Sequence, residues 1–299
     1  MITDSLERST LYFGLTELPL GDSKYDLGDG ILLYSSHAKF LSPLMLVNTS
    51  DTAASTAGTK PAYWQIGGEA SEITAELVIP AEAASSSKER FELARLIVFL
   101  IRLWTNPAVG LHVFSNHPLS LLTTLPSDIQ PRIVPLETYP RHFRLDLIDN
   151  SKIQSSLAWV QENWKTAQHL YNTSAEFRFA ADAMDSGQFV ENSALTLVSL
   201  WGALEAIFSP STSELKFRVS SLIASYLEPP GQTRIKVQKE IAVLYDKRSA
   251  AAHGKPRHEG NDLLKTFELL RKVIIKMLRR KAVPTKEELE QFLFGVVVR

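Results

Sequence analysis

The 299-residue sequence contains no cysteine. This absence excludes disulfides, thiolate metal sites, iron–sulfur clusters and a cysteine nucleophile, and it fits a reducing compartment. Several common motifs are also missing, since no GxxxxGK[ST] loop, no GxGxxG after a strand, no GxSxG and no HExxH occurs. We therefore expect neither a metal ion nor an organic cofactor.

Long apolar runs are scarce as well. The most apolar stretch, residues 91–104, carries Glu92, Arg95 and Arg102 and is shorter than the roughly 20 apolar residues of a membrane span. The first ten residues, MITDSLERST, have acids where a signal peptide has a basic start and an apolar run. The sequence predicts a cytoplasmic protein with no membrane partner.

Of the residues present, 44% are hydrophobic and 22% charged, which is typical of a globular chain, and the length favours two domains. The first half alternates like strands and contains one long apolar helix that ends at Trp104. The candidate strands cover residues 31–35, 63–66, 73–79, 111–114 and 143–148. These patterns predict an α+β domain over residues 1–149.

Helical periodicity replaces strand patterns beyond residue 149. Candidate helices cover residues 151–171, 174–184, 189–208, 213–227, 233–252, 261–280 and 286–294. Short turns rich in Pro, Gly and Ser separate them, which favours an antiparallel arrangement of neighbours. The sequence therefore predicts an all-α helical bundle over residues 150–299.

The net charge of −1 hides an uneven distribution of charges. Residues 232–281 hold 14 Lys and Arg against 5 Asp and Glu, whereas the rest of the chain holds 18 basic and 28 acidic residues. A basic region on an acidic chain indicates either a polyanion-binding surface or a solvated helix face.

Two helices of the second half carry the residues that could take part in a chemical reaction. The helix over 189–208 is apolar nearly all round, and Glu205 is the single acid of its second half. A carboxylate in such a position needs a charged or hydrogen-bonding partner. The second helix, in the segment IAVLYDKRSAAAHGKP over 241–256, carries Arg248 and ends near His253, before Gly254.

Arg248 and His253 suit the chemistry of a phosphate ester. A histidine that titrates near neutrality can take and give a proton, and a forked guanidinium suits a phosphate or a phosphorane. Five residues along an ideal helix correspond to about 140° of rotation, so the two side chains would not share one face. They converge only if the last turn distorts or a second copy contributes. The alternative is a basic helix end capped by glycine.

The segment RSAAAH with the following Gly254 resembles the Arg-x4-His signature of the HEPN superfamily, and of its Apea-like branch in particular. The branch also carries a pattern similar to WGALEAIF, residues 201–208, upstream of a block similar to LYDKRSAAAHG, residues 244–254. The two blocks stand in the order that the family requires. The resemblance covers about residues 150–299.

This resemblance implies a HEPN-like helical bundle that forms a homodimer. Catalytic members are metal-independent endoribonucleases in which the RNA 2′-hydroxyl attacks the adjacent phosphate and leaves a 2′,3′-cyclic phosphate and a 5′-hydroxyl. Carried over to this chain, His253 would be the general acid and base, and Arg248 would stabilise the phosphorane. The partner would be RNA, because DNA lacks the attacking group.

The resemblance also suggests supporting residues, each with a structural alternative. Glu205 would orient Arg248 or form a buried ion pair between two helices. Tyr245 would stack on a base or belong to the core, and Ser249 stands where many active members have a more strongly polar residue. Three cations beside the site would contact RNA phosphates or be merely solvated: Lys247, Lys255 and Arg257.

Three functions follow from these patterns. The first is a HEPN ribonuclease of toxin–antitoxin or antiphage defence systems, with a possible antitoxin or regulatory partner and an N-terminal domain that senses a trigger. The second is a catalytically inactive module that binds RNA or protein. The third is a regulator that responds to a ligand of residues 1–149. The three differ in whether RNA is cleaved and in which domain binds.

Overall fold

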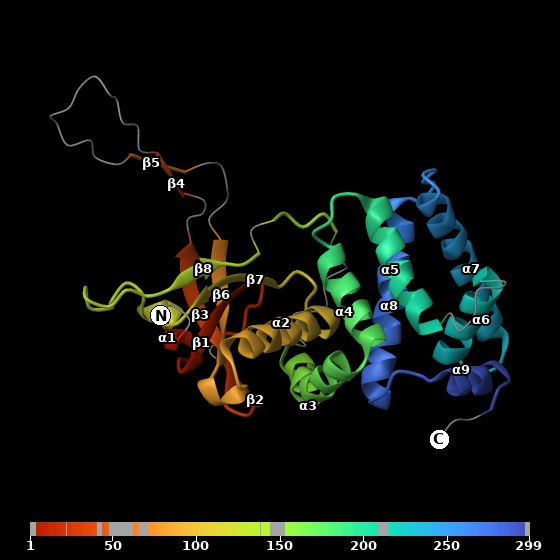
Figure 1. Cartoon of the computed structure of the whole chain (residues 1–299), viewed down its shortest axis with the longest axis horizontal. Coiled ribbons are helices and arrows are strands. Elements are labelled where there is room, and N and C mark those ends of the chain that lie inside the picture. The colour runs from red at the N-terminus through yellow and green to blue at the C-terminus, as the bar shows by residue number, and fades with distance from the viewer. Residues whose placement is uncertain are drawn as a thin grey trace. The chain divides into compact units, whose positions relative to one another are not determined.

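The computed structural model describes residues 4–21, 23–40, 44–47, 62–65, 71–137, 139–143, 153–208 and 215–296. An antiparallel sheet in the first half is followed by helices in the second (Figure 1). The predicted order, α+β and then helical, is thereby confirmed. Among the described residues, no helix combines the length and the apolar character that a membrane span requires.

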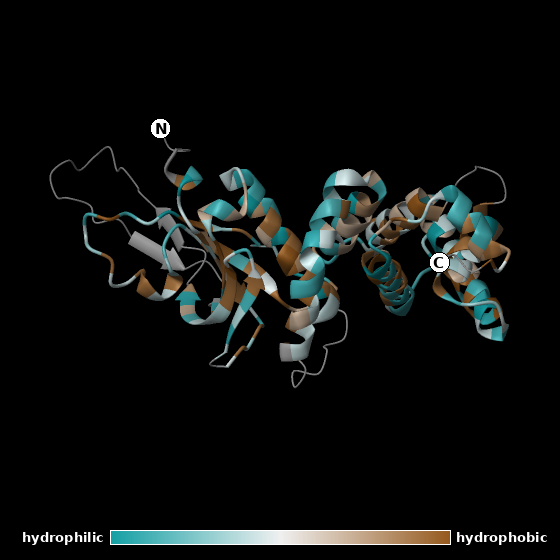
Figure 2. Cartoon of the chain, turned by 90° about the horizontal axis from the view of Figure 1, so that it is seen from below, coloured by the Kyte–Doolittle hydropathy of each residue, from teal (hydrophilic) through white to brown (hydrophobic). Residues whose placement is uncertain are grey.

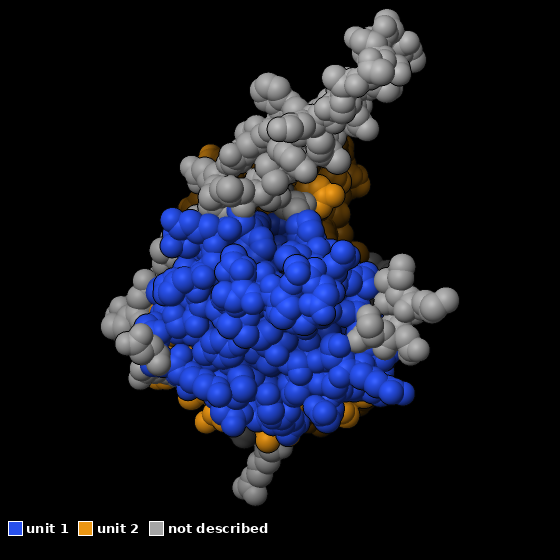
Figure 3. Space-filling view, turned by 90° about the vertical axis from the view of Figure 1, so that its left-hand side faces the viewer, with its two compact units in different colours: residues 1–98, 109–138 blue, residues 99–108, 139–299 orange. Residues whose placement is uncertain are grey.

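The chain divides into two compact units (Figure 3). Unit 1 contains Met1–Val98 and Val109–Thr138, and unit 2 contains Phe99–Ala108 and Tyr139–Arg299. The end of one helix, α2 (Ser87–Trp104), therefore belongs to unit 2 although its beginning belongs to unit 1. The boundary predicted at residues 149 and 150 lies outside the described residues.

Unit 1 is built on a six-stranded sheet with the strand order β2-β3-β6-β1-β7-β8, in which every pair is antiparallel. A separate two-stranded sheet pairs β4 with β5. The strands are β1 (Leu11–Thr16), β2 (Lys24–Gly28), β3 (Ile31–Phe40), β4 (Leu44–Val47), β5 (Ala62–Gln65), β6 (Ser71–Ile79), β7 (Gly110–Ser115) and β8 (Ile133–Pro135). Short helical turns are α1 (Asp4–Glu7), η1 (Ala81–Ala83) and η2 (Leu119–Leu121).

One face of the large sheet carries the core of unit 1. Leu11, Phe13 and Leu15 of β1 are fully buried and alternate along the strand, as a half-buried strand requires. Phe91 of α2 packs edge-on against Phe13, with ring centroids 5.2 Å apart, and lies 4.6 Å from the Phe114 ring. The apolar helix predicted to end at Trp104 is therefore α2, and its Phe91 anchors it to the sheet.

The sequence-predicted strands are confirmed in β3, β5, β6 and β7, whereas β1, β2, β4 and β8 were not predicted. The strand predicted over 143–148 lies outside the described residues, apart from residue 143. In β1, Gly14 interrupts the apolar run and hides the strand pattern. A Cβ at this position would come within 2.7 Å of Val113 and 2.8 Å of Leu119, so close packing across the sheet requires glycine there.

The opposite face of the sheet holds a fully buried acid, Glu76 of β6. The Tyr34 hydroxyl donates a hydrogen bond to Oε1 of Glu76, and the Leu119 backbone N–H donates to Oε2 over 2.7 Å. Burial raises the pKa of Glu76 from its ordinary value of 4.5, while both hydrogen bonds act to lower it. This carboxyl thereby attaches η2 to the sheet.

Within its described residues, unit 2 contains the end of α2 and seven further helices. These are α3 (Ile153–Thr173), α4 (Ala175–Gly187), α5 (Ser193–Phe208), α6 (Leu215–Leu227), α7 (Gln232–Ala252), α8 (Gly260–Arg280) and α9 (Lys286–Leu293). Their bounds agree with the predicted helices to within a few residues. Hydrophobic and hydrophilic residues alternate along most of them (Figure 2).

Local signals in the sequence explain the helix ends. The Ser174 hydroxyl accepts a hydrogen bond from the Phe177 N–H at the start of α4, and Thr285 and Glu288 form a capping box at the start of α9. Gly254 follows α7 with a φ of +70°, a left-handed conformation that favours glycine. The end of α7 is therefore fixed beside His253.

Candidate functional site

Glu205 of α5 and Arg248 of α7 form an ion pair between the two helices. Arg248 Nη2 donates to Glu205 Oε2 over 2.6 Å, and the Tyr245 hydroxyl donates to Glu205 Oε1 over 2.9 Å. Both oxygens of the carboxylate are thus held. The sequence predicts a charged or hydrogen-bonding partner for Glu205, and the carboxylate has one of each: the charged partner is the arginine of the Arg-x4-His segment.

Tyr245 packs as a core residue, with only 6% of its surface exposed. Its ring stands edge-on to that of Trp201, with centroids 5.2 Å apart, and the Arg248 guanidinium lies over the Tyr245 ring at 5.6 Å from its centroid. Burial raises the pKa of Tyr245, and the hydrogen bond to Glu205 acts in the same direction. Of the two roles predicted for Tyr245, this geometry fits the core role.

Arg248 is partly exposed at the surface of unit 2, and not all of its N–H donors have a partner in the part of the chain that the structure describes. Its side chain is 23% exposed and that of Glu205 is 19% exposed. The buried Nε of Arg248 has no hydrogen-bond partner among the described residues, and the same holds for Nη1 within the described part of the chain. A guanidinium has five N–H donors; one contacts Glu205 and the Nε–H is buried, so the remaining N–H groups of Nη1 and Nη2 are the ones that could contact an anion.

His253 is the C-cap residue of α7, and its side chain is exposed. Its backbone N–H donates to the Ser249 carbonyl over 3.2 Å, which continues the helical pattern to this residue. Because α7 stays regular through Ala252, the last turn lacks the distortion that would turn His253 and Arg248 toward one face. Within one chain the two side chains leave α7 about 140° apart around its axis.

The other predicted residues take different places. Lys247 Nζ donates to the Arg257 carbonyl over 2.9 Å and lies 3.7 Å from the Asp262 carboxylate, so it holds the loop before α8. The side chains of Lys255 and Arg257 are exposed and form no ion pair within the described part of the chain. Ser249 is half-buried.

A strip of apolar and small residues on α5 runs beside this site, and the sequence did not predict its exposure. Leu195 is 63% exposed, Gly202 is half-buried and Ala206 is exposed, at a spacing that places them on one side of the helix. Phe179 of α4 is 43% exposed and would lie 3.3 Å from a Cβ on Gly202. A helix that is apolar nearly all round is usually buried on every side, so this exposure is not apparent from the sequence pattern of α5.

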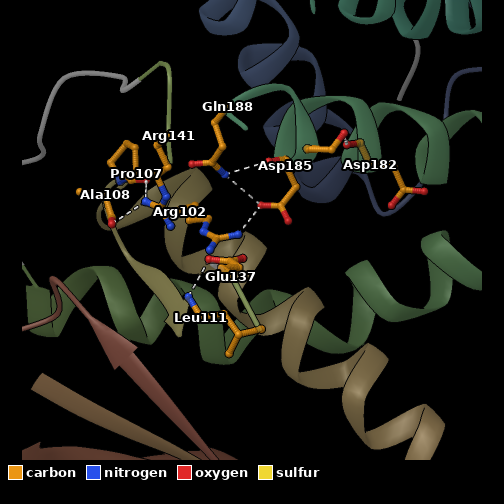
Figure 4. Close-up of polar contacts among 10 residues, drawn as sticks. Arg102, Pro107, Ala108, Leu111, Glu137, Arg141, Asp182, Asp185 and Gln188 are labelled. Carbon is orange, nitrogen blue, oxygen red and sulfur yellow. Dashed lines mark hydrogen bonds and ion pairs between the residues drawn. The ribbon is translucent and has the colours of Figure 1, made fainter. Parts of the chain in front are cut away.

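A second polar cluster lies where α2 and α4 end (Figure 4). Arg102, which is 6% exposed, pairs with Asp185 over 2.7 Å, and Gln188 Nε2 donates to the Asp185 carbonyl over 2.8 Å. Arg141 donates to the Pro107 and Ala108 carbonyls. The adjoining cavity, lined in part by Phe99, Phe143 and Phe267, measures about 30 Å³, the share of one water molecule. The cavity has no room for a larger ligand, so this cluster holds the ends of α2 and α4 and the loops that follow them in place.

Other histidine and acidic residues of the described chain lie in separate local environments. No group of three or more His, Asp and Glu that could hold a metal ion occurs among the described residues. His117 Nδ1 lies 3.0 Å from the Asn116 amide oxygen, and burial lowers the pKa of His112. Asp182 accepts a hydrogen bond from the Tyr171 hydroxyl over 2.7 Å. Asp146 and Asp149 lie outside the described residues.

Comparisons with known proteins give no match, whether to a protein-family model, to a curated protein or to a solved structure.

Proposed function

We propose that unit 2 is a metal-independent endoribonuclease of the HEPN type, with Arg248 and His253 as its catalytic residues. One observation carries the proposal. The carboxylate of Glu205, itself held by Tyr245, fixes the partly exposed guanidinium of Arg248 through one of its N–H donors. Arg248 lies on the helix that ends at the exposed His253. The guanidinium suits stabilisation of a developing negative charge, and the exposed imidazole of His253 suits proton transfer once a second copy completes the site.

The reaction would be a transesterification at phosphorus that is assisted by proton transfer. The imidazole of His253 takes the proton of the RNA 2′-hydroxyl as the 2′-oxygen bonds to the adjacent phosphorus. The bond from phosphorus to the 5′-oxygen then breaks, and the imidazolium returns a proton to the departing 5′-oxygen. Arg248 donates hydrogen bonds to the non-bridging oxygens of the phosphorane. The products are a 2′,3′-cyclic phosphate and a 5′-hydroxyl. Lys255 and Arg257, both exposed near His253, would contact neighbouring phosphates.

The active form in this proposal is a homodimer. Since Arg248 and His253 leave α7 in different directions, a complete site needs His253 of the partner subunit beside Arg248. The α5 strip supports this assembly, because the exposed Leu195 and Ala206 offer apolar area that a second copy could cover. Such an enzyme would act in the cytoplasm as a toxin or antiphage effector, restrained by unit 1 or by a separate antitoxin.

The Arg248–Glu205 ion pair also favours a second candidate function. A carboxylate 2.6 Å from the guanidinium offsets its charge, and Ser249 is followed by three alanines where a more polar group would aid catalysis. With these features unit 2 would bind RNA or protein through the same basic surface without cutting. Cleavage therefore separates the two candidates.

The test is an RNA cleavage assay in EDTA with mapped product ends. We expect cyclic-phosphate ends from the natural sequence and a loss of about 10²- to 10⁴-fold in rate for Arg248→Ala and for His253→Ala. Arg95→Ala and His169→Ala, at exposed positions on α2 and α3, are the matched controls and should cleave normally. Cleavage that survives both site variants would overturn the proposal, and RNA binding without any cleavage would favour the second candidate.

A further inference from the structure

Two half-buried tryptophans of unit 2 stack on each other at its surface. Trp104, at the end of α2, and Trp159, on α3, have ring centroids 4.6 Å apart and planes that differ by 18°. The other two tryptophans of this unit, Trp164 and Trp201, are 3% and 0% exposed. Trp104 and Trp159 therefore leave indole surface in contact with solvent.

An open hollow adjoins this pair, which we call the tryptophan pocket. Its volume of about 550 Å³ lies within the range of roughly 300–1,000 Å³ that is usual for small-ligand clefts. Its lining combines flat aromatic surface with an acceptor and donors: Trp104, Trp159, Ser155, Ser156, Ala158, Glu162 and Arg271. This combination suits a planar ring with polar edges.

Two arginines of α8 flank the pocket. The Arg279 guanidinium lies over the Trp104 ring, 5.7 Å from its centroid. Arg271 donates from Nε to the Leu103 carbonyl over 2.6 Å and from Nη1 to Glu268 over 3.3 Å. Its Nη2 forms no hydrogen bond with the described residues. Eight residues of helix separate the two arginines by about 12 Å along one side of α8, so a chain of phosphates could contact both.

We propose that the tryptophan pocket binds a base of single-stranded RNA, an inference that rests on the proposed function and names the form of its substrate. The base stacks on the indole pair, and Glu162 accepts a hydrogen bond from an amino group at the edge of the base. Arg271 and Arg279 contact the phosphates on either side. A base within a duplex is already stacked and paired, whereas an unpaired base can turn into such a pocket.

Binding is measured with the Arg248→Ala/His253→Ala double variant, so that the RNA stays intact. A short oligoadenylate should quench tryptophan fluorescence, and anisotropy of the labelled RNA should give its affinity. Trp159→Ala in this background should weaken binding about 5- to 100-fold, the effect expected for one lost stacking contact. Trp159→Phe keeps an aromatic ring on Trp104 and should bind nearly normally, as should Trp164→Phe at the buried control position.

Charge and base identity provide two further measurements. Arg279→Ala should reduce the salt dependence of binding by about one phosphate contact, whereas Lys286→Ala, at an exposed position of α9, should leave it unchanged. Uracil has no amino group for Glu162, so oligouridylate should bind more weakly than oligoadenylate. In Glu162→Gln, where the amide can also donate, this difference should shrink.

Three outcomes would overturn the inference: equal affinities of Trp159→Ala and the parent, equal binding of a duplex, or equal binding of adenosine monophosphate, which would make the pocket a site for free nucleotides. Equal thermal midpoints of Trp159→Ala and Trp159→Phe would exclude unfolding as the cause of any loss. If RNA binding depends on Trp159 but no cleavage occurs, the pocket is supported and the proposed ribonuclease activity is not. If RNA is cleaved through Arg248 and His253 while Trp159→Ala binds RNA normally, the activity is supported and the pocket is refuted.

Discussion

Glu76 of unit 1 and Glu205 of unit 2 both accept hydrogen bonds at each carboxylate oxygen, but from different kinds of donor. Glu76 of unit 1 is fully buried and accepts hydrogen bonds from two neutral donors, the Tyr34 hydroxyl and the Leu119 N–H. Glu205 of unit 2 is 19% exposed and contacts a cation, Arg248, as well as Tyr245. The buried acid without a cation has a raised pKa, whereas the half-buried Glu205 lies within reach of solvent and ligands.

This difference separates a structural role from a functional one. Glu76 connects β3, β6 and η2, so its loss should weaken unit 1 and leave any RNA chemistry intact. Glu205 connects α5 to α7 at the surface, and its main effect should be on where the Arg248 guanidinium lies. In this view Glu205 is a positioning residue, and its substitution should cost little stability.

The largest effect on stability is expected from Glu76→Ala. The substitution removes the acceptor of the buried Leu119 N–H and of the half-buried Tyr34 hydroxyl, at a cost of about 2–4 kcal/mol in the free energy of unfolding. Urea denaturation at neutral pH measures this loss. Glu72→Ala, at an exposed position of the same strand, is the control, and a loss no greater than that of the control would refute the structural role of Glu76.

A smaller effect on stability, about 1 kcal/mol, is expected from Glu205→Ala, because water can replace part of what Arg248 and Tyr245 lose at a partly exposed site. RNA cleavage should nevertheless fall at least tenfold, since the guanidinium is no longer held. Glu205→Gln keeps an acceptor for Tyr245 or for Arg248 and should recover part of the activity. A higher KM with an unchanged kcat would indicate that Glu205 acts in RNA binding and not in transition-state stabilisation.

Sequence patterns predicted unit 2 better than unit 1 because helices carry their signals locally. The periodicity and caps of 153–293 need no partner strand, and Glu205 already indicated a partner within the bundle. β1 depends on neighbours far along the chain, since it pairs with β6 and β7, and Gly14 is explained only by the side chains of Val113 and Leu119 opposite it. The tryptophan pocket could not be predicted for the same reason: Trp104 and Trp159 are far apart in the sequence and meet only where the end of α2 packs against α3.

The smallest effect is expected from pH, through Glu76. Because burial raises its pKa, the folded chain binds this proton more tightly than the unfolded chain does. The resulting stabilisation is fully present below the ordinary pKa of 4.5 and is lost as the pH rises through the raised pKa. The difference in unfolding free energy between the natural sequence and Glu76→Gln, measured by urea denaturation from acid to neutral pH, cancels the other titrating groups and should fall with pH.

Glu7 is the control, because its hydrogen bonds to Ser87 lower its pKa. The difference in unfolding free energy between the natural sequence and Glu7→Gln should therefore rise with pH. A difference for Glu76 that rises with pH would mean that its two hydrogen bonds outweigh its burial, and the contrast with Glu205 would then disappear.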